Sequence, residues 1–408
     1  MRLLYDLALF LLFPFIILRL FLRARKQPDY LSHVGERFGF YDIAPGEEVI
    51  WLHAVSVGET RAAAPLVEQL IEAHPECSIL VTHMTPTGRE TGKKLFEGKA
   101  VTAYLPYDYP FAVRRFLKHF RPKKGLLMET ELWFNLIHQC REENIPLFLV
   151  NARLSQKSLE GYMRIGKLAR NALNELEGIA AQTEQDAARL RKLGAEKVSV
   201  CGNLKFDVSP PENIPDFRPL FPGKRVFLAA STREGEEELI LDAFSNMEGL
   251  LLVIVPRHPQ RFPEIENMLK SRAIRYAKRS ENRRIDPETE VFLGDSMGEM
   301  YAYYASCDCA FIGGSLLPFG GQNLIEAASM GKPAFLGPHT YNFEEASEAA
   351  IQAGAAIRVG DARELAREVS DLLADPEKLK EMGGKGIAFA ENNRGAAGKI
   401  MGLIGAEL

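Results

Sequence analysis

Short apolar segments alternate with helical segments in two stretches of this chain, and this alternation most restricts the folds it can adopt. In the first stretch, β-strands are predicted at residues 49–57, 78–82, 124–128, 146–150, 179–182 and 198–201. In the second stretch, they are predicted at 226–230, 250–255, 291–293 and 310–313. Strands that alternate with helices form parallel sheets with helices on both faces. The sequence therefore predicts an α/β protein with two parallel sheets.

Helices are expected between these strands, at residues 58–74, 236–244, 262–269 and 297–305. The first has Leu66, Val67, Leu70 and Ile71 at helical spacing, which is typical of a helix that packs one face on a core. Open α/β sheets bind ligands beyond the carboxyl ends of their strands. We therefore expect the functional site in a cleft between the carboxyl ends of the two sheets.

Residues 208–224 separate the two stretches and contain five prolines, which is typical of a linker. A chain of 408 residues is also longer than one typical core. The predicted organisation is an N-terminal segment at 1–26, a Rossmann-like domain at 27–207, a linker at 208–224 and a second Rossmann-like domain at 225–408. The last helix of the second domain can pack back on the first.

The N-terminal segment is a candidate membrane anchor. Residues 3–22 are almost wholly apolar, with interruptions at Asp6, Pro14 and Arg19. About 20 apolar residues can span a bilayer, and a helix of this kind can also lie in the interface. Basic residues follow the apolar run, unlike in a cleaved signal peptide, and they place the remaining chain on the cytoplasmic side. A buried N-terminal helix is the alternative interpretation.

Charge and cysteine content exclude some classes of function. A net charge of -4 argues against a protein that binds nucleic acid by bulk charge. The five cysteines show no disulfide framework, which favours a reducing compartment. The eight histidines are scattered and show no metal-ligand spacing, so we expect no metal and no cofactor.

Residues 311–331 predict a phosphate-binding turn. An apolar strand ends at Gly313 and Gly314, a second glycine pair follows at 320–321, and a helix is expected from Asn323 to Met330. Glycines allow close approach of the backbone to an anion, and the first N–H groups of a helix have no internal partner. Glu326, one turn after Asn323, is placed to bind the two hydroxyls of a ribose. Alternatively, the glycines serve packing only.

Three further loops follow strands of the second domain, at residues 231–238, 256–262 and 294–300. Arg257 and His258 can donate hydrogen bonds to a phosphate or a base edge, and 297–299 offer backbone groups at a predicted helix start. Together with the glycine-rich turn, these loops favour a nucleotide pocket.

Acidic residues follow two strands of the first domain. Glu59 is a candidate general base, because a carboxylate at the cleft can remove the proton of an attacking hydroxyl. Alternatively, it is a helix-start carboxylate whose pKa the helix dipole lowers. Glu129 and Glu131 can bind a sugar hydroxyl, orient the base or cap a helix. The basic residues Lys93, Lys94, Arg114, Arg115 and Lys118 can hold acceptor phosphates or form solvated helix surface.

Taken together, the motifs resemble those of the Kdo transferases, which add 3-deoxy-D-manno-octulosonic acid (Kdo) to the lipid A precursor in lipopolysaccharide biosynthesis. The resemblance rests on the N-terminal apolar segment, HAVSVGE at 53–59, METELW at 128–133, GNLKFD at 202–207, STREGE at 231–236, PRHP at 256–259, GDSMGE at 294–299 and GGSLLPFGGQN at 313–323. It implies a GT-B glycosyltransferase with two facing Rossmann-like domains, the first binding the acceptor. It also implies CMP-Kdo as donor, lipid IVA as acceptor, inversion at the anomeric carbon and no metal.

The resemblance also implies roles for individual residues. Glu59 becomes the base that deprotonates the acceptor hydroxyl, with Glu129 or Glu131 in support. The expected CMP-binding residues are Ser231, Glu234, Pro256, Arg257, His258, Met297, Gly298, Glu299, Gly320, Gly321, Gln322, Asn323, Leu324, Ile325 and Glu326. Gln322 and Arg233 stand where the family commonly has histidine. The expected location is the inner membrane of a Gram-negative bacterium, with the catalytic domains on the cytoplasmic side.

Two rival interpretations remain at this point. A GT-B transferase that uses a UDP-sugar would share the fold and the glycine-rich turn. A membrane-tethered nucleotide-binding module without catalysis would share the pocket. The number of Kdo residues transferred and the oligomeric state do not follow from these motifs.

Overall fold

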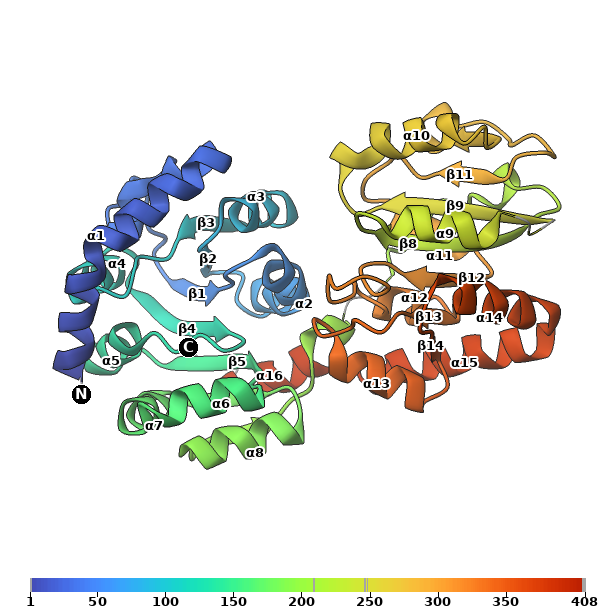
Figure 1. Ribbon diagram of the computed structural model, residues 1–408. Helices are drawn as coiled ribbons and strands as arrows, with labels where there is room; N and C mark the ends of the chain where they lie inside the picture. Colours follow the sequence, from blue (N-terminus) through green and yellow to red (C-terminus); the bar gives the residue numbers. More distant parts are fainter. Residues whose placement is uncertain (1, 208–209, 246, 248, 406–408) are drawn as a thin grey trace. The chain divides into compact units, whose positions relative to one another are not determined.

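The computed structural model describes residues 2–207, 210–245, 247 and 249–405. The chain forms two compact units, each built around a seven-stranded sheet (Figure 1). Unit 1 comprises Met1–Val208 and Asn393–Leu408, and unit 2 comprises Ser209–Asn392.

The sheet of unit 1 is parallel, with the strand order β3-β2-β1-β4-β5-β6-β7. Its strands are β1 (Val49–His53), β2 (Ser78–His83), β3 (Ala100–Tyr104), β4 (Pro122–Met128), β5 (Leu147–Ala152), β6 (Gly178–Ala181) and β7 (Val198–Val200). Chain order reverses at β1, because β2 pairs with one edge of β1 and β4 with the other. The loops after β1 and β4 therefore meet at the switch point, where doubly wound sheets bind ligands.

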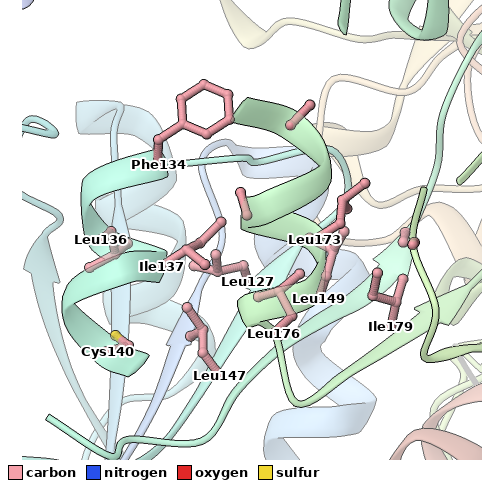
Figure 2. Close-up of a cluster of buried hydrophobic side chains, with 14 of the residues drawn as sticks. Leu127, Phe134, Leu136, Ile137, Cys140, Leu147, Leu149, Leu173, Leu176 and Ile179 are labelled. Carbon is pink, nitrogen blue, oxygen red and sulfur yellow. The ribbon is translucent and has the colours of Figure 1, made fainter. Parts of the chain in front are cut away.

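Helices cover both faces of this sheet. They are α2 (Val57–Ala73), α3 (Pro86–Leu95), α4 (Pro110–Phe120), α5 (Phe134–Glu142), α6 (Gln156–Met163), α7 (Gly166–Glu175), α8 (Glu184–Leu193) and α16 (Ala396–Ile404). Three short 3₁₀ segments join them: η1 (Pro28–Leu31), η2 (Val34–Phe38) and η3 (Leu204–Asp207). Leu127 and Leu149 face the core under α5 and α7 (Figure 2), whereas the neighbouring Leu126 and Phe148 face α2 and α16. This alternation produces one core on each face of the sheet.

Helix α1 (Arg2–Lys26) packs along unit 1. The Tyr5 hydroxyl donates to Asp108 Oδ2 at 2.9 Å, Asn135 Nδ2 donates to Asp6 Oδ1 at 2.7 Å, and the Tyr109 hydroxyl donates to the carbonyl of Leu9 at 2.9 Å. Among the described residues, it is the one helix long and apolar enough to cross a membrane. Its outward face is apolar and exposed: Leu3, Leu4, Leu7, Phe10, Leu11, Leu12, Phe13, Phe15, Leu18, Phe21 and Leu22.

Helix α16 comes late in the chain but belongs to unit 1. Ala397, Ile400 and Ile404 are buried in the same core as the inner face of α2. Asp207 caps this helix from a distance, because its carboxylate accepts hydrogen bonds from the backbone N–H groups of Gly395, Ala396 and Ala397. The chain therefore returns to its first unit after completing the second.

The sheet of unit 2 is also parallel, with the strand order β10-β11-β9-β8-β12-β13-β14. Its fourth strand, β11, lies between the second and third strands, whereas the fourth strand of unit 1 pairs with the first. The strands of unit 2 are β8 (Arg225–Thr232), β9 (Leu250–Pro256), β10 (Tyr276–Lys278), β11 (Val291–Leu293), β12 (Cys309–Ile312), β13 (Ala334–Leu336) and β14 (Ala356–Arg358). Its helices are α9 (Glu236–Phe244), α10 (Phe262–Ser271), α11 (Met300–Ser306), α12 (Ile325–Ser329), α13 (Glu344–Gln352), α14 (Ala362–Ala374) and α15 (Pro376–Asn392). Three 3₁₀ segments, η4 (Arg218–Leu220), η5 (Pro259–Arg261) and η6 (Arg279–Glu281), complete it. Here the switch point lies between β8 and β12.

The proline-rich segment packs on unit 2 in its described part. Phe217 and Phe221 are buried, and their rings contact Tyr303 and Phe292 at centroid distances of 5.2 and 4.9 Å. The five cysteines are free thiols, in agreement with the absence of a disulfide framework in the sequence.

Some predicted boundaries are wrong. The first strand ends at His53 rather than at residue 57, because Ala54, Val55 and Ser56 form a loop and Ser56 is the N-cap of α2. The helix predicted at 297–305 begins only at Met300, after a glycine with positive φ at 298. Strands β3, β10, β13 and β14 were not predicted.

Candidate active site

The two loops at the switch point of unit 1 bring together the carboxylates that the sequence singles out. Glu59 lies in the first turn of α2, directly after the β1 loop. Glu129 and Glu131 lie in the loop between β4 and α5. The pKa of Glu59 responds to the charges of both other carboxylates, so the three groups form one electrostatic cluster.

Both carboxylate oxygens of Glu59 accept hydrogen bonds from its own loop. The backbone N–H of Val55 donates to Oε2 at 2.7 Å, and the Ser56 hydroxyl donates to Oε1 at 3.1 Å. The side chain thus accepts a hydrogen bond from the N–H of Val55, the residue before the N-cap Ser56. These bonds fix the carboxylate in one position.

The pKa of Glu59 is raised to about 8, mainly by burial. The charges of Glu129 and Glu131 also raise it, and their effect is larger than the lowering by the two hydrogen bonds. The expectation that the helix dipole lowers this pKa is therefore wrong. Desolvation and the neighbouring like charges outweigh the effect of the dipole. A carboxylate with a pKa near neutrality can serve as a general base.

The other two carboxylates differ in their settings. Glu129 adopts a left-handed backbone conformation, with φ +59°, directly after β4, and its N–H donates to the carbonyl of Val150 at 3.0 Å. Burial raises the pKa of Glu131, while Trp133 favours its charged form. The left-handed conformation of Glu129 is uncommon for a residue other than glycine, and it marks a site where the fold constrains the backbone.

A lysine next to these acids was not assigned a role from the sequence. Lys205 lies in η3, which packs on α2, and burial lowers its pKa while the charges of Glu129 and Glu59 oppose that change. Arg153 adds a second positive charge nearby. The motif GNLKFD contains this lysine, but only the contacts of the folded chain reveal its acidic neighbours.

In unit 2, a buried glutamate organises the switch point. Glu236 is fully buried, and its carboxylate accepts hydrogen bonds from the N–H groups of Arg233 (2.9 Å), Gly314 (2.6 Å) and Leu316 (3.0 Å). It therefore ties the loop after β8 to the loop after β12. These loops pass so closely that a Cβ atom at Gly313 would lie 2.4 Å from the carbonyl oxygen of Ser231.

Basic side chains gather on these loops. The Arg257 N–H donates to the carbonyl of Thr232 at 3.0 Å, which places the end of β9 beside the end of β8. Burial lowers the pKa of His258, and the charges of Arg233 and Arg257 lower it further. Arg233 pairs with Glu234 at 3.0 Å and lies over the ring of Phe319 at 4.4 Å. Such a cluster is suited to bind an anion.

The glycine-rich turn contains two consecutive glycines in the left-handed conformation. Gly320 and Gly321 have φ values of +90° and +77°, and Asn323 Oδ1 accepts a hydrogen bond from the N–H of Ile325 at 3.1 Å. Asn323 Nδ2 lies 3.3 Å from Glu326 Oε1, so these two predicted residues are brought together. The helix itself is shorter than predicted, because α12 runs only from Ile325 to Ser329.

The remaining predicted residues line the same carboxyl edge or support it. Met297 is exposed, Gly298 has φ +82°, and Glu299 pairs with Arg279 at 2.8 Å. Pro256 ends β9, and Leu324 and Ile325 are buried beneath the turn. A Cβ atom at Gly314 would lie 3.2 Å from Gln322 Nε2.

One group of potential metal ligands lies elsewhere in the described residues. His74, Glu76 and Cys77 have ligand atoms within 4.8 Å of one another in the turn between α2 and β2. The sequence did not predict this grouping. The turn precedes β2 and so lies at the opposite edge of the sheet from Glu59.

Comparisons with known proteins agree with the chemistry of both units. Residues 32–208 match the family model described as 3-deoxy-D-manno-octulosonic-acid transferase (kdotransferase). Residues 227–389 match the model of glycosyl transferases group 1.

Relatives are similar over the whole chain. A 3-deoxy-D-manno-octulosonic acid transferase of Bordetella pertussis is 41% identical and covers 98% of each chain. A second one, of Haemophilus influenzae, is 37% identical over 99% of this chain and 98% of its own. Among solved structures, a UDP-GlcNAc 2-epimerase of Neisseria meningitidis covers 88% of this chain and 99% of its own, with a TM-score of 0.59 at 17% identity. The chain therefore belongs to the family of 3-deoxy-D-manno-octulosonic acid transferases and has the GT-B glycosyltransferase fold.

Proposed function

We propose that this protein transfers Kdo from CMP-Kdo to the lipid A precursor lipid IVA, with inversion at the anomeric carbon, without a metal ion and with Glu59 as general base. The observation that carries this proposal is the buried Glu59 carboxylate, which Val55 and Ser56 hold beside Glu129 and Glu131 in a chain of the Kdo transferase family. Burial and the two neighbouring carboxylates raise the pKa of Glu59 to about 8. A base whose pKa lies near the working pH combines a useful ionised fraction with a strong tendency to accept a proton.

In the proposed reaction, an acceptor hydroxyl lies within hydrogen-bond reach of Glu59. Its oxygen forms a bond to the anomeric carbon of Kdo as its proton passes to the Glu59 carboxylate. The bond between this carbon and the phosphate oxygen breaks on the opposite face, and CMP leaves with the electron pair. Attack opposite the leaving group inverts the configuration at the carbon. No oxidant, reductant or metal is needed for this balance.

Unit 2 is proposed to bind the CMP moiety. Arg257 and His258 would donate hydrogen bonds to the phosphate, which stabilises the negative charge on the departing group. Glu326, held by Asn323 at 3.3 Å, would accept hydrogen bonds from the two ribose hydroxyls. The other predicted residues would line the pocket: Ser231, Glu234, Pro256, Met297, Gly298, Glu299, Gly320, Gly321, Gln322, Leu324 and Ile325.

Glu129 and Glu131 are proposed to support the base. Their negative charges raise its pKa, and either side chain can also accept a hydrogen bond from a hydroxyl of the acceptor or the sugar. The basic residues of α3 and α4 are proposed to contact acceptor phosphates.

Helix α1 is proposed to hold the protein at the cytoplasmic face of the inner membrane, next to a lipid acceptor that remains in the bilayer. Its inner side makes polar contacts with unit 1 through Tyr5, Asp6 and the carbonyl of Leu9. A helix that spans the bilayer would have to break these contacts, so they favour a helix that lies in the interface with its apolar face toward the acyl chains.

The test is transfer of Kdo from CMP-Kdo to lipid IVA by purified protein, with the products followed by mass. Glu59→Gln should lower kcat by about 10²- to 10⁴-fold and leave CMP binding unchanged. Glu68→Gln, an exposed glutamate of the same helix, is the matched control and should retain activity. Full activity of Glu59→Gln would refute the proposed role of Glu59 as general base. If a UDP-sugar supports transfer, and UDP rather than CMP competes with it, CMP-Kdo is not the donor.

A further inference from the structure

The position of the Glu59 carboxylate depends on the three-residue loop that precedes α2. Val55 and Ser56 donate both hydrogen bonds that Glu59 accepts, at 2.7 and 3.1 Å. Residues 54–56 lie beyond the strand, but two backbone hydrogen bonds still tie them to the β2 segment: the Ala54 N–H donates to the carbonyl of Thr82 at 2.9 Å, and the Met84 N–H donates to the carbonyl of Val55 at 3.2 Å. The carbonyl of Ala54 takes part in neither bond, so a side-chain donor can hold the loop at this point.

His83, the last residue of β2, contacts this loop from the adjacent strand. Its Nδ1 lies 2.9 Å from the carbonyl oxygen of Ala54 and 3.3 Å from the Thr60 hydroxyl. The Thr60 hydroxyl donates in turn to the carbonyl of Ser56 at 2.8 Å. One imidazole nitrogen therefore contacts both the start of the loop and the helix turn that follows it.

The chemistry of His83 suits a fixed, uncharged donor. A carbonyl oxygen only accepts, so Nδ1 must carry the proton. The side chain is fully buried, and burial lowers its pKa to about 4, so the ring is neutral at neutral pH. Its Nε2 has no hydrogen-bond partner among the described residues and packs against α3, where a Cβ atom at Gly92 would lie 2.5 Å away.

We propose that His83 is a positioning residue that holds the 54–56 loop, and through it the Glu59 carboxylate, in the geometry for proton transfer. This inference rests on the proposed role of Glu59 as base. His83 touches neither substrate nor reacting atoms; it acts through the Ala54 carbonyl and Thr60. Gly92 is part of the same device, because only a residue without a side chain leaves room for the ring.

The first test compares His83→Leu with His83→Asn, since the asparagine amide keeps a donor close to the Nδ1 position. His83→Leu should lower kcat by about 100-fold, the loss that a misplacement of about 1 Å produces. His83→Asn should stay within several-fold of the wild type, and the KM for CMP-Kdo should not change in either variant. His74→Leu is the matched control: a buried histidine of the same unit, at the other end of α2.

The pH profile of kcat separates positioning from general destabilisation. The groups that face Glu59 are Glu129, Glu131 and Lys205, and those that face His83 are His53 and Arg89. All remain in the His83 variants. A released loop admits water to Glu59, so the rise of kcat with pH should move below about pH 8 in His83→Leu and stay in place in His83→Asn and His74→Leu.

Gly92→Ala is the second route to the same result, because it displaces the ring without removing its donor. If His83→Leu does not fold, Gly92→Ala tests whether His83 positions the 54–56 loop. The proposal is overturned if the variant that folds has the wild-type kcat and pH profile, or if His74→Leu shows equal changes. Glu59→Gln is assayed in parallel. If Glu59→Gln stays active, the proposed role of Glu59 as base is refuted. If Glu59→Gln is inactive while His83→Leu keeps the wild-type kcat and pH profile, only the positioning role of His83 is refuted.

Discussion

The switch points of the two sheets carry different charged side chains. In unit 1, the loops after β1 and β4 carry Glu59, Glu129 and Glu131. In unit 2, the loops after β8 and β9 carry Arg233, Arg257 and His258, and the loop after β12 adds backbone N–H groups. In both sheets the first strand lies between the second strand and a strand from later in the unit: β1 between β2 and β4, and β8 between β9 and β12.

This difference shows that topology places a site and that side chains decide its chemistry. Carboxylates buried next to one another have raised pKa values and can accept a proton. Cationic groups instead favour an anion such as a phosphate. The following experiments test how far this division of chemistry between the units holds.

The largest effect is expected for Glu236, a buried acid at the switch point of unit 2. Glu236→Ala leaves two buried N–H groups, those of Gly314 and Leu316, without acceptors. We expect a loss of about 3 kcal/mol or more in the free energy of unfolding of unit 2, at about 1–3 kcal/mol for each unsatisfied group.

Both tryptophans, Trp51 and Trp133, belong to unit 1. Denaturant unfolding followed by circular dichroism should therefore show an earlier transition in Glu236→Ala, while the tryptophan fluorescence transition stays in place. If the unfolding transition followed by circular dichroism is the same in Glu236→Ala and the wild type, Glu236 does not stabilise the loops, and its role is instead in binding.

The next effect tests whether positive charge in unit 2 binds the nucleotide. Arg257→Ala should weaken CMP binding by about 10- to 100-fold, since a hydrogen bond to a charged group contributes about 1.5–3 kcal/mol. Isothermal titration with CMP measures the change. Arg272→Ala removes an arginine that pairs with Glu238 on the surface of the same unit and should bind CMP normally. Equal affinity of both variants would contradict a phosphate role for Arg257.

A smaller effect is expected on the stability of unit 1 as a function of pH. Glu59 has a pKa of about 8 in the folded protein and an ordinary value near 4.5 when unfolded. Between these values the folded form binds a proton that the unfolded chain has released, so its stability falls as pH rises. Glu59→Gln removes this term, so it should be more stable than the wild type at pH 9 by about 1 kcal/mol or more.

Tryptophan fluorescence during denaturant unfolding at pH 5, 7 and 9 measures this difference. The gain of Glu59→Gln over the wild type should grow with pH and level off above about pH 8. A gain that is equal at pH 5 and pH 9 would mean that burial does not disfavour the charged carboxylate.

The smallest effect is expected at the N-terminus of α16. Asp207→Ala removes the acceptor of three backbone N–H groups and should cost about 1 kcal/mol of unit 1 stability, the usual cost of a lost N-cap. Asp216→Ala, which removes the acceptor of one exposed N–H in unit 2, should leave the tryptophan transition unchanged. A similar shift in both variants would show that the effect is not specific to the cap.

Sequence patterns predicted the parts of this fold that depend on periodicity. Alternation of strands and helices located both sheets, and the residues that follow β1, β4, β9 and β12 were predicted to lie at carboxyl edges, where they do lie. Three residues carry little periodic signal, so strands of this length were predicted in two cases, β7 and β11, and missed in three, β10, β13 and β14.

Burial of charge could not be predicted in this way. The run STREGEEE contains four glutamates, of which Glu234 is half-exposed while Glu236 and Glu237 are fully buried. Nothing in the run distinguishes them, because their partners, among them Gly314, Leu316 and Arg261, come from elsewhere in the chain. The raised pKa of Glu59 and the acidic setting of Lys205 have the same origin, since both depend on groups that only folding brings close.

The return of α16 to unit 1 has a consequence for synthesis on the ribosome. Domains of a growing chain usually fold in order, the first before the second. Here Ala397, Ile400 and Ile404 complete the core on one face of the first sheet, and they are made only after all of unit 2. Unit 1 must therefore wait with apolar surface on α2 uncovered until translation reaches residue 404, while unit 2 already has every residue it needs. The unit that begins the chain is the last one able to finish folding.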